Sequence, residues 1–180
     1  NVRDMADFLD RLGIPGAHLI GYGGGSVTGF HFAIEHPDRA ASLTSIGFSG
    51  LPYHVDLFDT FAPEALLRDG RYDIINEMNR KHHDAHGGDW QGYLRRTLED
   101  DRDHTDLGEA RIAGMRTPLL IVAGETDPYS TPAQHARMRE LRPDCEVFVC
   151  PGGSHRPHMV GEHTVAVNRV ILDFLTRHAF

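Results

Sequence analysis

A glycine-rich turn between an apolar segment and a helix-forming segment is the first place in these 180 residues where chemistry is expected. Residues 21–25 read Gly-Tyr-Gly-Gly-Gly, in the frame where Gly-x-Ser-x-Gly presents a nucleophilic serine on a sharp strand-to-helix turn. The central residue here is Gly23, which has no side chain to attack a substrate. Because glycine tolerates strained backbone, the sequence predicts that the turn forms without its nucleophile.

Ser26 does not restore the pattern, because the frame 24–28 lacks the closing glycine. Its expected role is to cap the helix that follows. The glycine run also fails as a dinucleotide-binding pattern, since Gly-x-Gly-x-x-Gly ends at Ser26 or Thr28 instead of glycine. A phosphate-binding loop would need Gly-Lys-Ser/Thr, which is absent from the sequence.

Two other residues could supply acid–base chemistry. Asp127 follows an apolar segment, where a carboxylate fixed at a strand end could orient a histidine and stabilise its imidazolium. His155 lies in the loop Gly152-Gly-Ser-His, which could bring an imidazole over the glycine turn as a general base. The alternatives are an aspartate that caps its own turn and a solvent-facing loop histidine, one of 13 in the chain.

Alternating strands and helices would position these residues. Apolar patterning predicts strands at 17–21, 42–48, 118–123 and 145–150, and helices at 2–12, 26–36, 132–141 and 164–178. This order predicts an α/β fold with a parallel sheet. Four strands are few for a large α/β sheet, so we expect an N-terminal part of the fold to be missing from this chain, leaving an open apolar edge on the first strand.

The intervening residues differ in character. We expect a core segment at 1–50, a helical insertion at 51–115 and a second core segment at 116–180, with insertion helices at 63–68, 72–86 and 90–100. Aromatic residues could line an apolar substrate pocket, although core packing explains those of the insertion equally well: Tyr22, Phe58, Phe61, Trp90 and Tyr93.

The net charge and the apolar content limit the classes of binding partner that we expect. A net charge of −8 argues against nucleic acid and anionic membranes, and no apolar stretch approaches the roughly 20 residues of a membrane helix. The expected localisation is cytoplasmic. His82 and His86 have helical metal-ligand spacing, but no third ligand is evident, so a solvated helix end is favoured and no metal is expected.

Three motifs in order make nearly the whole chain resemble the α/β-hydrolase superfamily. They are His-Leu-Ile-Gly-Tyr-Gly-Gly-Gly (18–25), Leu-Leu-Ile-Val-Ala-Gly-Glu-Thr-Asp-Pro (119–128) and Pro-Gly-Gly-Ser-His-Arg-Pro-His (151–158). The resemblance implies the order nucleophile, acid, histidine, and therefore Gly23 at the nucleophile position, Asp127 as the acid and His155 as the base.

The resemblance also implies an oxyanion hole and a cap. The backbone N–H of Gly24 would donate to the oxyanion, and the second donor would belong to an earlier part of the fold that this chain lacks. The helical insertion would cap the active site and set substrate choice. No cofactor is implied. The expected partners are a small-molecule substrate, the N-terminal remainder of the same protein and, as an open alternative, a second copy of this chain.

Three functions stay open at this point. The chain is a serine hydrolase for esters, lactones or related carbonyl compounds with its serine replaced by Gly23. Alternatively, it is a serine-independent lyase or hydrolase using His155 and Asp127, or a non-catalytic binding or signalling protein. The last would resemble the N-myc downstream-regulated family, which keeps the fold with glycine at this position, although the presence of both Asp127 and His155 argues against it.

Overall fold

A computed structural model describes residues 2–53, 56–82 and 87–178 of the chain. The chain forms two units, which we call the sheet unit (residues 1–53 and 105–180) and the helical unit (residues 54–104). Residues 105–115, expected in the insertion, belong to the sheet unit, where α7 (Glu109–Gly114) contacts α8 (Pro132–Leu141).

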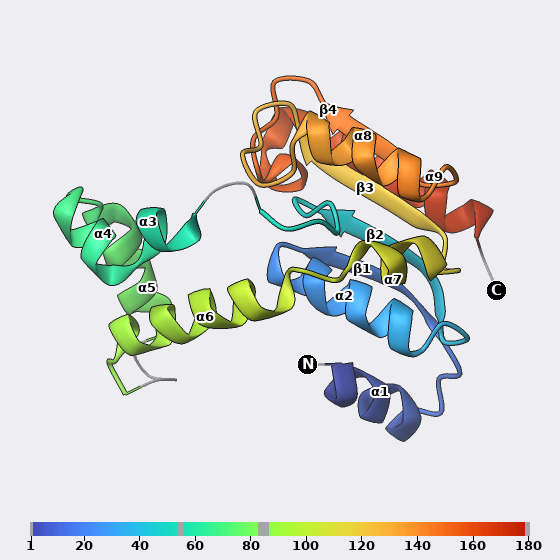
Figure 1. Ribbon diagram of the computed structural model, residues 1–180, viewed down its shortest axis with the longest axis horizontal. Coiled ribbons are helices and arrows are strands. Elements are labelled where there is room, and N and C mark those ends of the chain that lie inside the picture. Colours follow the sequence, from blue (N-terminus) through green and yellow to red (C-terminus); the bar gives the residue numbers. More distant parts are fainter. Residues whose placement is uncertain (1, 54–55, 83–86, 179–180) are drawn as a thin grey trace. The chain divides into compact units, whose positions relative to one another are not determined.

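The sheet unit contains a four-stranded parallel sheet in the order β1-β2-β3-β4 (Figure 1). Its strands are β1 (Ala17–Tyr22), β2 (Ala40–Ile46), β3 (Leu119–Gly124) and β4 (Glu146–Cys150). The predicted parallel α/β arrangement is confirmed, with each strand end within two residues of its expected position. Because the strands run in one direction, their carboxyl ends share one edge, where α/β folds place their ligands.

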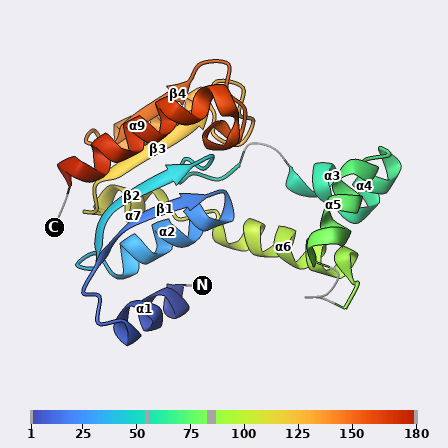
Figure 2. The same cartoon turned by 180° about the vertical axis from the view of Figure 1, so that it is seen from behind.

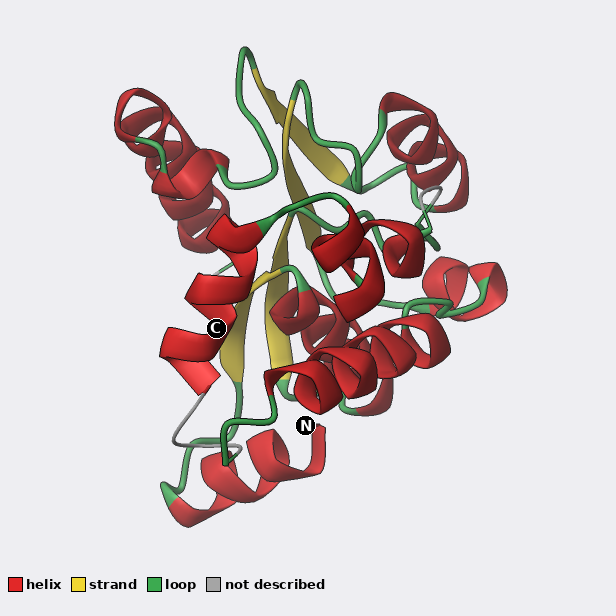
Figure 3. Cartoon of the chain, turned by 90° about the vertical axis from the view of Figure 1, so that its left-hand side faces the viewer, coloured by secondary structure: helices red, strands yellow, loops and turns green. Residues whose placement is uncertain are grey.

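Helices cover both faces of this sheet (Figures 2 and 3). The remaining helices of the unit are α1 (Val2–Arg11), α2 (Gly24–Glu35), α9 (Gly161–Arg177) and a short 3₁₀ turn at Pro157–Met159. Alternate residues of β3 point to opposite faces. Leu119 and Ile121 join an apolar cluster with residues of α1, α2, α7 and α8, whereas Leu120 and Val122 join a cluster with α9.

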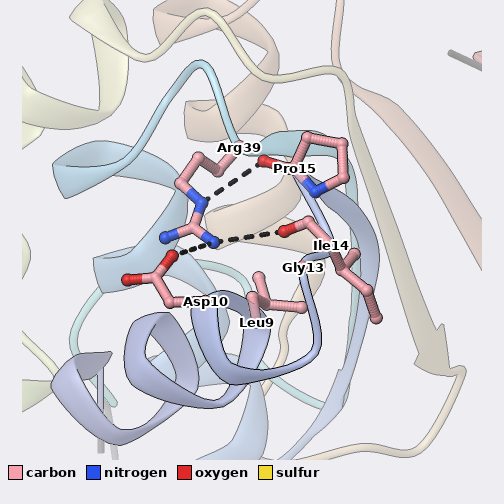
Figure 4. A pocket seen from close by; sticks show the side chains of 6 residues that line it. All are labelled: Leu9, Asp10, Gly13, Ile14, Pro15 and Arg39. Carbon is pink, nitrogen blue, oxygen red and sulfur yellow. Dashed lines mark hydrogen bonds and ion pairs between the residues drawn. The ribbon is translucent and has the colours of Figure 1, made fainter.

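The first strand lies at an edge of the described sheet, and Ile20 on it is 54% exposed. A pocket of about 420 Å³ lies nearby, beside α1 (Figure 4). The Arg39 guanidinium lines it and donates to the backbone oxygens of Ile14 and Pro15 while pairing with Asp10 at 2.8 Å. These bonds join the loop after α1 to the start of β2. The charged residues that line the pocket therefore have a structural role.

The helical unit consists of α3 (Leu57–Phe61), α4 (Pro63–Arg68), α5 (Tyr72–His82) and α6 (Trp90–His104). Its own small core contains Leu66, Ile75, Leu94 and Leu98. Helix α3 was not predicted; Asp56 caps it by accepting from the backbone N–H of Phe58. Helix α6 continues four residues beyond the predicted end. The predicted continuation of α5 over 83–86 lies outside the described residues.

Within the described ranges, every helix is too short or too polar to cross a bilayer.

Candidate active site

The turn after β1 has the strained backbone that the sequence predicts. Gly23 has φ 53° and ψ −121°, in the left-handed region that favours glycine, and it is the N-cap of α2. Its N–H donates to the Ile46 oxygen at 3.0 Å, and its oxygen accepts from the Ser26 N–H at 2.9 Å. The turn is therefore fixed both to β2 and to the first turn of α2.

Gly21 and Gly23 are required for different reasons. A Cβ on Gly21 would lie 2.5 Å from backbone atoms of Gly25 and Ser26, so only glycine fits there without a shift of the turn. A Cβ on Gly23 would meet nothing within 4 Å, and the same holds for Gly24. Among the described residues, position 23 therefore has room for a side chain, and the obstacle to one is the positive φ.

The predicted role of Ser26 as a helix cap is wrong. Its side chain is fully buried and donates to the Gly21 oxygen at 2.8 Å, while its oxygen accepts from the Ile46 N–H at 3.1 Å. The N-cap residue of α2 is Gly23 instead, and no side chain caps this end of the helix. Because Ser26 Oγ is committed to the ends of β1 and β2, it is a structural hydroxyl and not an alternative nucleophile.

Asp127 and His155 are brought together across the ends of β3 and β4. His155 Nδ1 lies 3.1 Å from each carboxylate oxygen of Asp127, whose side chain has no exposed surface. Asp127 Oδ1 also accepts from the Tyr129 N–H at 2.9 Å, so the turn-capping alternative holds alongside the pairing. With Nδ1–H donating to a carboxylate, Nε2 is the nitrogen left to act as a base.

The outer nitrogen of His155 is available. No described residue hydrogen-bonds to Nε2, and the side chain is 25% exposed. A histidine held in this way could accept a proton from water, from a substrate or from a hydroxyl at position 23. The amide hydrogen of Gly24, in the first turn of α2, has no intrahelical acceptor and could serve an oxyanion.

Two glycines, Gly47 and Gly124, let the histidine loop approach the sheet. A Cβ on Gly47, just after β2, would lie 2.7 Å from His155 Cε1. A Cβ on Gly124, at the end of β3, would lie 2.1 Å from the Ser154 oxygen. The signal for Gly47 was weak, because a glycine after a strand is common in any turn and its partner lies far along the chain.

Aromatic rings surround the imidazole. The Tyr22 ring lies 5.2 Å from His155 and 4.8 Å from His158, and the Tyr129 ring lies 4.7 Å from His155 at 75°. Burial raises the pKa of the Tyr22 phenol, opposed by the charge of Arg156, so this ring stays neutral near His155. Tyr22, expected to line the substrate pocket, thus contacts both histidines.

The His158 ring packs against the Tyr22 ring. Its buried Nδ1 has no hydrogen-bond partner among the described residues. Burial lowers its pKa, and the charges of His155 and Arg156 lower it further. A neutral His158 is therefore favoured.

The remaining pocket candidates belong to the helical unit. Phe58, Phe61 and Trp90 pack against that unit's own core, which supports core packing over a pocket lining. Tyr93 stacks on His82 with ring centroids 4.1 Å apart. His86 lies outside the described residues, and within the described part of the chain no three His, Cys, Asp or Glu residues group as metal ligands would.

The chain matches a known protein family. The model of the alpha/beta hydrolase family matches residues 1–170. The chain belongs to this family. A protein named as a carbamate hydrolase, RutD, of a Caulobacter species is 26% identical over 197 residues, covering 98% of this chain and 71% of the relative. A 2-hydroxy-6-oxononadienedioate/2-hydroxy-6-oxononatrienedioate hydrolase of Burkholderia vietnamiensis is 23% identical over 207 residues, covering 98% and 68%.

Solved structures show the same fold. A meta-cleavage product hydrolase of Pseudomonas fluorescens has a TM-score of 0.70 at 18% identity, covering 99% of this chain and 71% of that one. An enol-lactonase of Burkholderia xenovorans also has a TM-score of 0.70, at 20% identity, covering 97% and 71%. This member of the alpha/beta hydrolase family therefore shares its architecture with several hydrolases, while glycine stands at position 23, where the sequence predicts a nucleophile turn.

Proposed function

We propose that the site is that of a hydrolase for esters, lactones or related carbonyl compounds, with Gly23 in place of the nucleophilic serine. The pairing of Asp127 with His155 Nδ1, at the same sheet edge as a turn built for a nucleophile, carries this proposal. The names of the relatives point the same way, because a carbamate and a 2-hydroxy-6-oxo dienedioate both contain carbonyl groups.

The reaction of a serine at position 23 follows from the geometry. Its hydroxyl would attack the carbonyl carbon while His155 Nε2 takes the proton, and the Gly24 N–H would stabilise the oxyanion. His155 would then return the proton to the leaving oxygen, giving an acyl-enzyme, and the same histidine would activate water to release the acid. With Gly23 no acyl-enzyme forms, so this route is closed in the chain as it stands.

Ester hydrolysis by the natural chain and by Gly23→Ser tests the proposal. With short p-nitrophenyl esters, we expect Gly23→Ser to raise kcat/KM by at least about 10²-fold, the scale of an engaged general base. Gly23→Ala is the matched control, because it imposes the same positive φ without a hydroxyl. Equal rates for the serine and alanine variants, both folded, would contradict the proposal.

A second candidate is a serine-independent enzyme, favoured by the unpartnered Nε2 of His155 and the open space over Gly23. His155 would then deprotonate water or a carbon acid directly, with Asp127 stabilising the imidazolium. This candidate predicts a measurable activity in the natural chain that His155→Gln abolishes. Absence of turnover in every variant, with ligand binding retained, would favour the non-catalytic alternative.

A further inference from the structure

Hydrogen bonds alone do not fix the plane of the His155 ring. Nδ1 is equidistant from the two Asp127 oxygens, at 3.1 Å each, and this contact at one ring nitrogen does not by itself stop the imidazole from tilting out of alignment with the carboxylate. Close contacts with the faces and edges of the ring must supply the remaining constraint. Gly47 closes one side by backbone proximity, and Tyr22 contacts the ring at 5.2 Å and 47°.

Among the described residues, Tyr129 makes the closest ring contact with His155, and it contacts both members of the Asp127–His155 pair. Its ring meets His155 at 4.7 Å in an edge-to-face arrangement, and its backbone N–H donates to Asp127 Oδ1 at 2.9 Å. One residue therefore orients the carboxylate through its backbone and the imidazole through its ring.

The Tyr129 ring packs in turn against a second aromatic ring. Its ring contacts Tyr53 at 5.7 Å, and Tyr53 contacts Phe48 at 5.6 Å, both edge to face. The buried Gln134 amide donates to the oxygens of Leu51 and Pro52, which fixes the segment that carries Tyr53. The chain of rings thus runs from the apolar core to the histidine.

We propose that Tyr129 is a positioning residue that sets the plane of the His155 imidazole and keeps the proton on Nδ1. Without its ring, the imidazole tilts, Nδ1–H loses its alignment with Asp127, and the Nε2–H tautomer gains population. The inference bears on the same histidine as the proposed hydrolase, but its primary test needs no turnover and can be made with Gly23 in place.

The test is the tautomer of His155 in the natural chain, read from the imidazole ¹⁵N shifts of histidine-labelled protein and assigned with His155→Gln. Tyr129→Leu removes the ring and keeps the backbone N–H that bonds Asp127. We expect the ratio of Nδ1–H to Nε2–H forms to fall by about 2- to 10-fold, the scale of an aromatic pair contact. Tyr129→Phe retains the ring and should keep the natural ratio.

Unchanged ¹⁵N shifts of His155 in a folded Tyr129→Leu variant would overturn the inference. If that variant does not fold, Tyr53→Leu decides, because it keeps the Tyr129 ring and removes the ring that packs against it; a smaller shift in the same direction supports the inference and no shift overturns it. In the Gly23→Ser background, Tyr129→Leu should lower kcat with little change in KM. Absence of turnover in the Gly23→Ser chain that keeps Tyr129 would refute the proposed hydrolase while leaving the tautomer result standing.

Discussion

The two halves of the candidate site differ in what forms them: side chains form the acid–histidine half, and backbone forms the turn half. The acid–histidine half consists of side chains in contact on several sides: Asp127 is fully buried, and His155 touches Asp127, Tyr22 and Tyr129. The turn half is bare backbone, because Cβ atoms on Gly23 and Gly24 would meet nothing within 4 Å. The turn therefore keeps its frame without a side chain at position 23.

That independence has a physical source. The conformation of the turn is fixed by the close approach at Gly21, the buried hydroxyl of Ser26 and the bond from Gly23 N–H to Ile46. None of these contacts uses a side chain at position 23. A substitution there should therefore change chemistry, whereas substitutions at the supporting positions should change stability.

The largest expected effect lies in the acid–histidine half. In the Gly23→Ser background, Asp127→Asn should lower kcat by about 10⁴-fold, because an amide cannot hold the imidazole in its working tautomer or stabilise the imidazolium. Steady-state ester hydrolysis measures the loss. The same substitution in the natural chain should leave the fold intact, judged by circular dichroism, and a loss of kcat below tenfold would contradict the assigned role.

Gly21→Ala should produce the largest loss of stability in the turn half. Its Cβ would lie 2.5 Å from backbone, and relieving such overpacking costs about 1–3 kcal/mol of unfolding free energy. Gly25→Ala is the control, because its Cβ meets nothing and alanine favours the helix that contains it. Urea denaturation of both variants compares them; equal stabilities would show that the close approach at Gly21 is not required.

Ser26→Ala should lower the unfolding free energy by no more than Gly21→Ala does. It leaves the Ile46 N–H without its Ser26 Oγ acceptor and the Gly21 oxygen without its donor, in a fully buried place, for about 1–3 kcal/mol. If Ser26 were instead a nucleophile, its replacement would abolish any activity of the natural chain without loss of stability. Parallel measurement of unfolding free energy and of ester hydrolysis separates the two roles.

The smallest expected effect is on the pH dependence of stability, through a histidine close to Asp127. Buried His135 bonds Ser130 at 2.9 Å, and its pKa is lowered first by burial and then by Arg139, with Asp127 opposing. A lowered pKa favours the neutral form in the fold, so its stabilisation is present above about pH 6.5 and is lost as pH falls toward the folded value.

Both proteins should lose unfolding free energy when the pH is lowered from 7.5 to 5.5. The loss should be smaller for His135→Gln than for the natural chain, and the two losses should differ by less than about 1.4 kcal/mol. Glutamine keeps a donor for Ser130 Oγ and does not titrate. Urea denaturation at the two pH values measures the difference, and the pH dependence that remains includes His158, whose pKa is also lowered. An identical pH dependence in both proteins would show that His135 does not contribute.

Sequence patterns predicted the strands, because these follow from local apolar periodicity, whereas the pairing of Asp127 with His155 was expected from the resemblance of three motifs to the α/β-hydrolase superfamily. They did not predict Tyr129 or Gly47, whose contacts with His155 join residues far apart in the chain. The role of Ser26 was predicted wrongly, because its position at a helix start suggested a cap while the neighbouring end of β2 supplied better partners.

Covalent labelling tests the central claim most directly. A fluorophosphonate esterifies only a hydroxyl that a neighbouring base activates. The account predicts one adduct on the Gly23→Ser chain, located at position 23 by peptide mass spectrometry, with none on the natural chain and a much slower reaction when His155→Gln is added. An adduct at Ser26 in the natural chain, or no adduct on a folded Gly23→Ser chain, would contradict it.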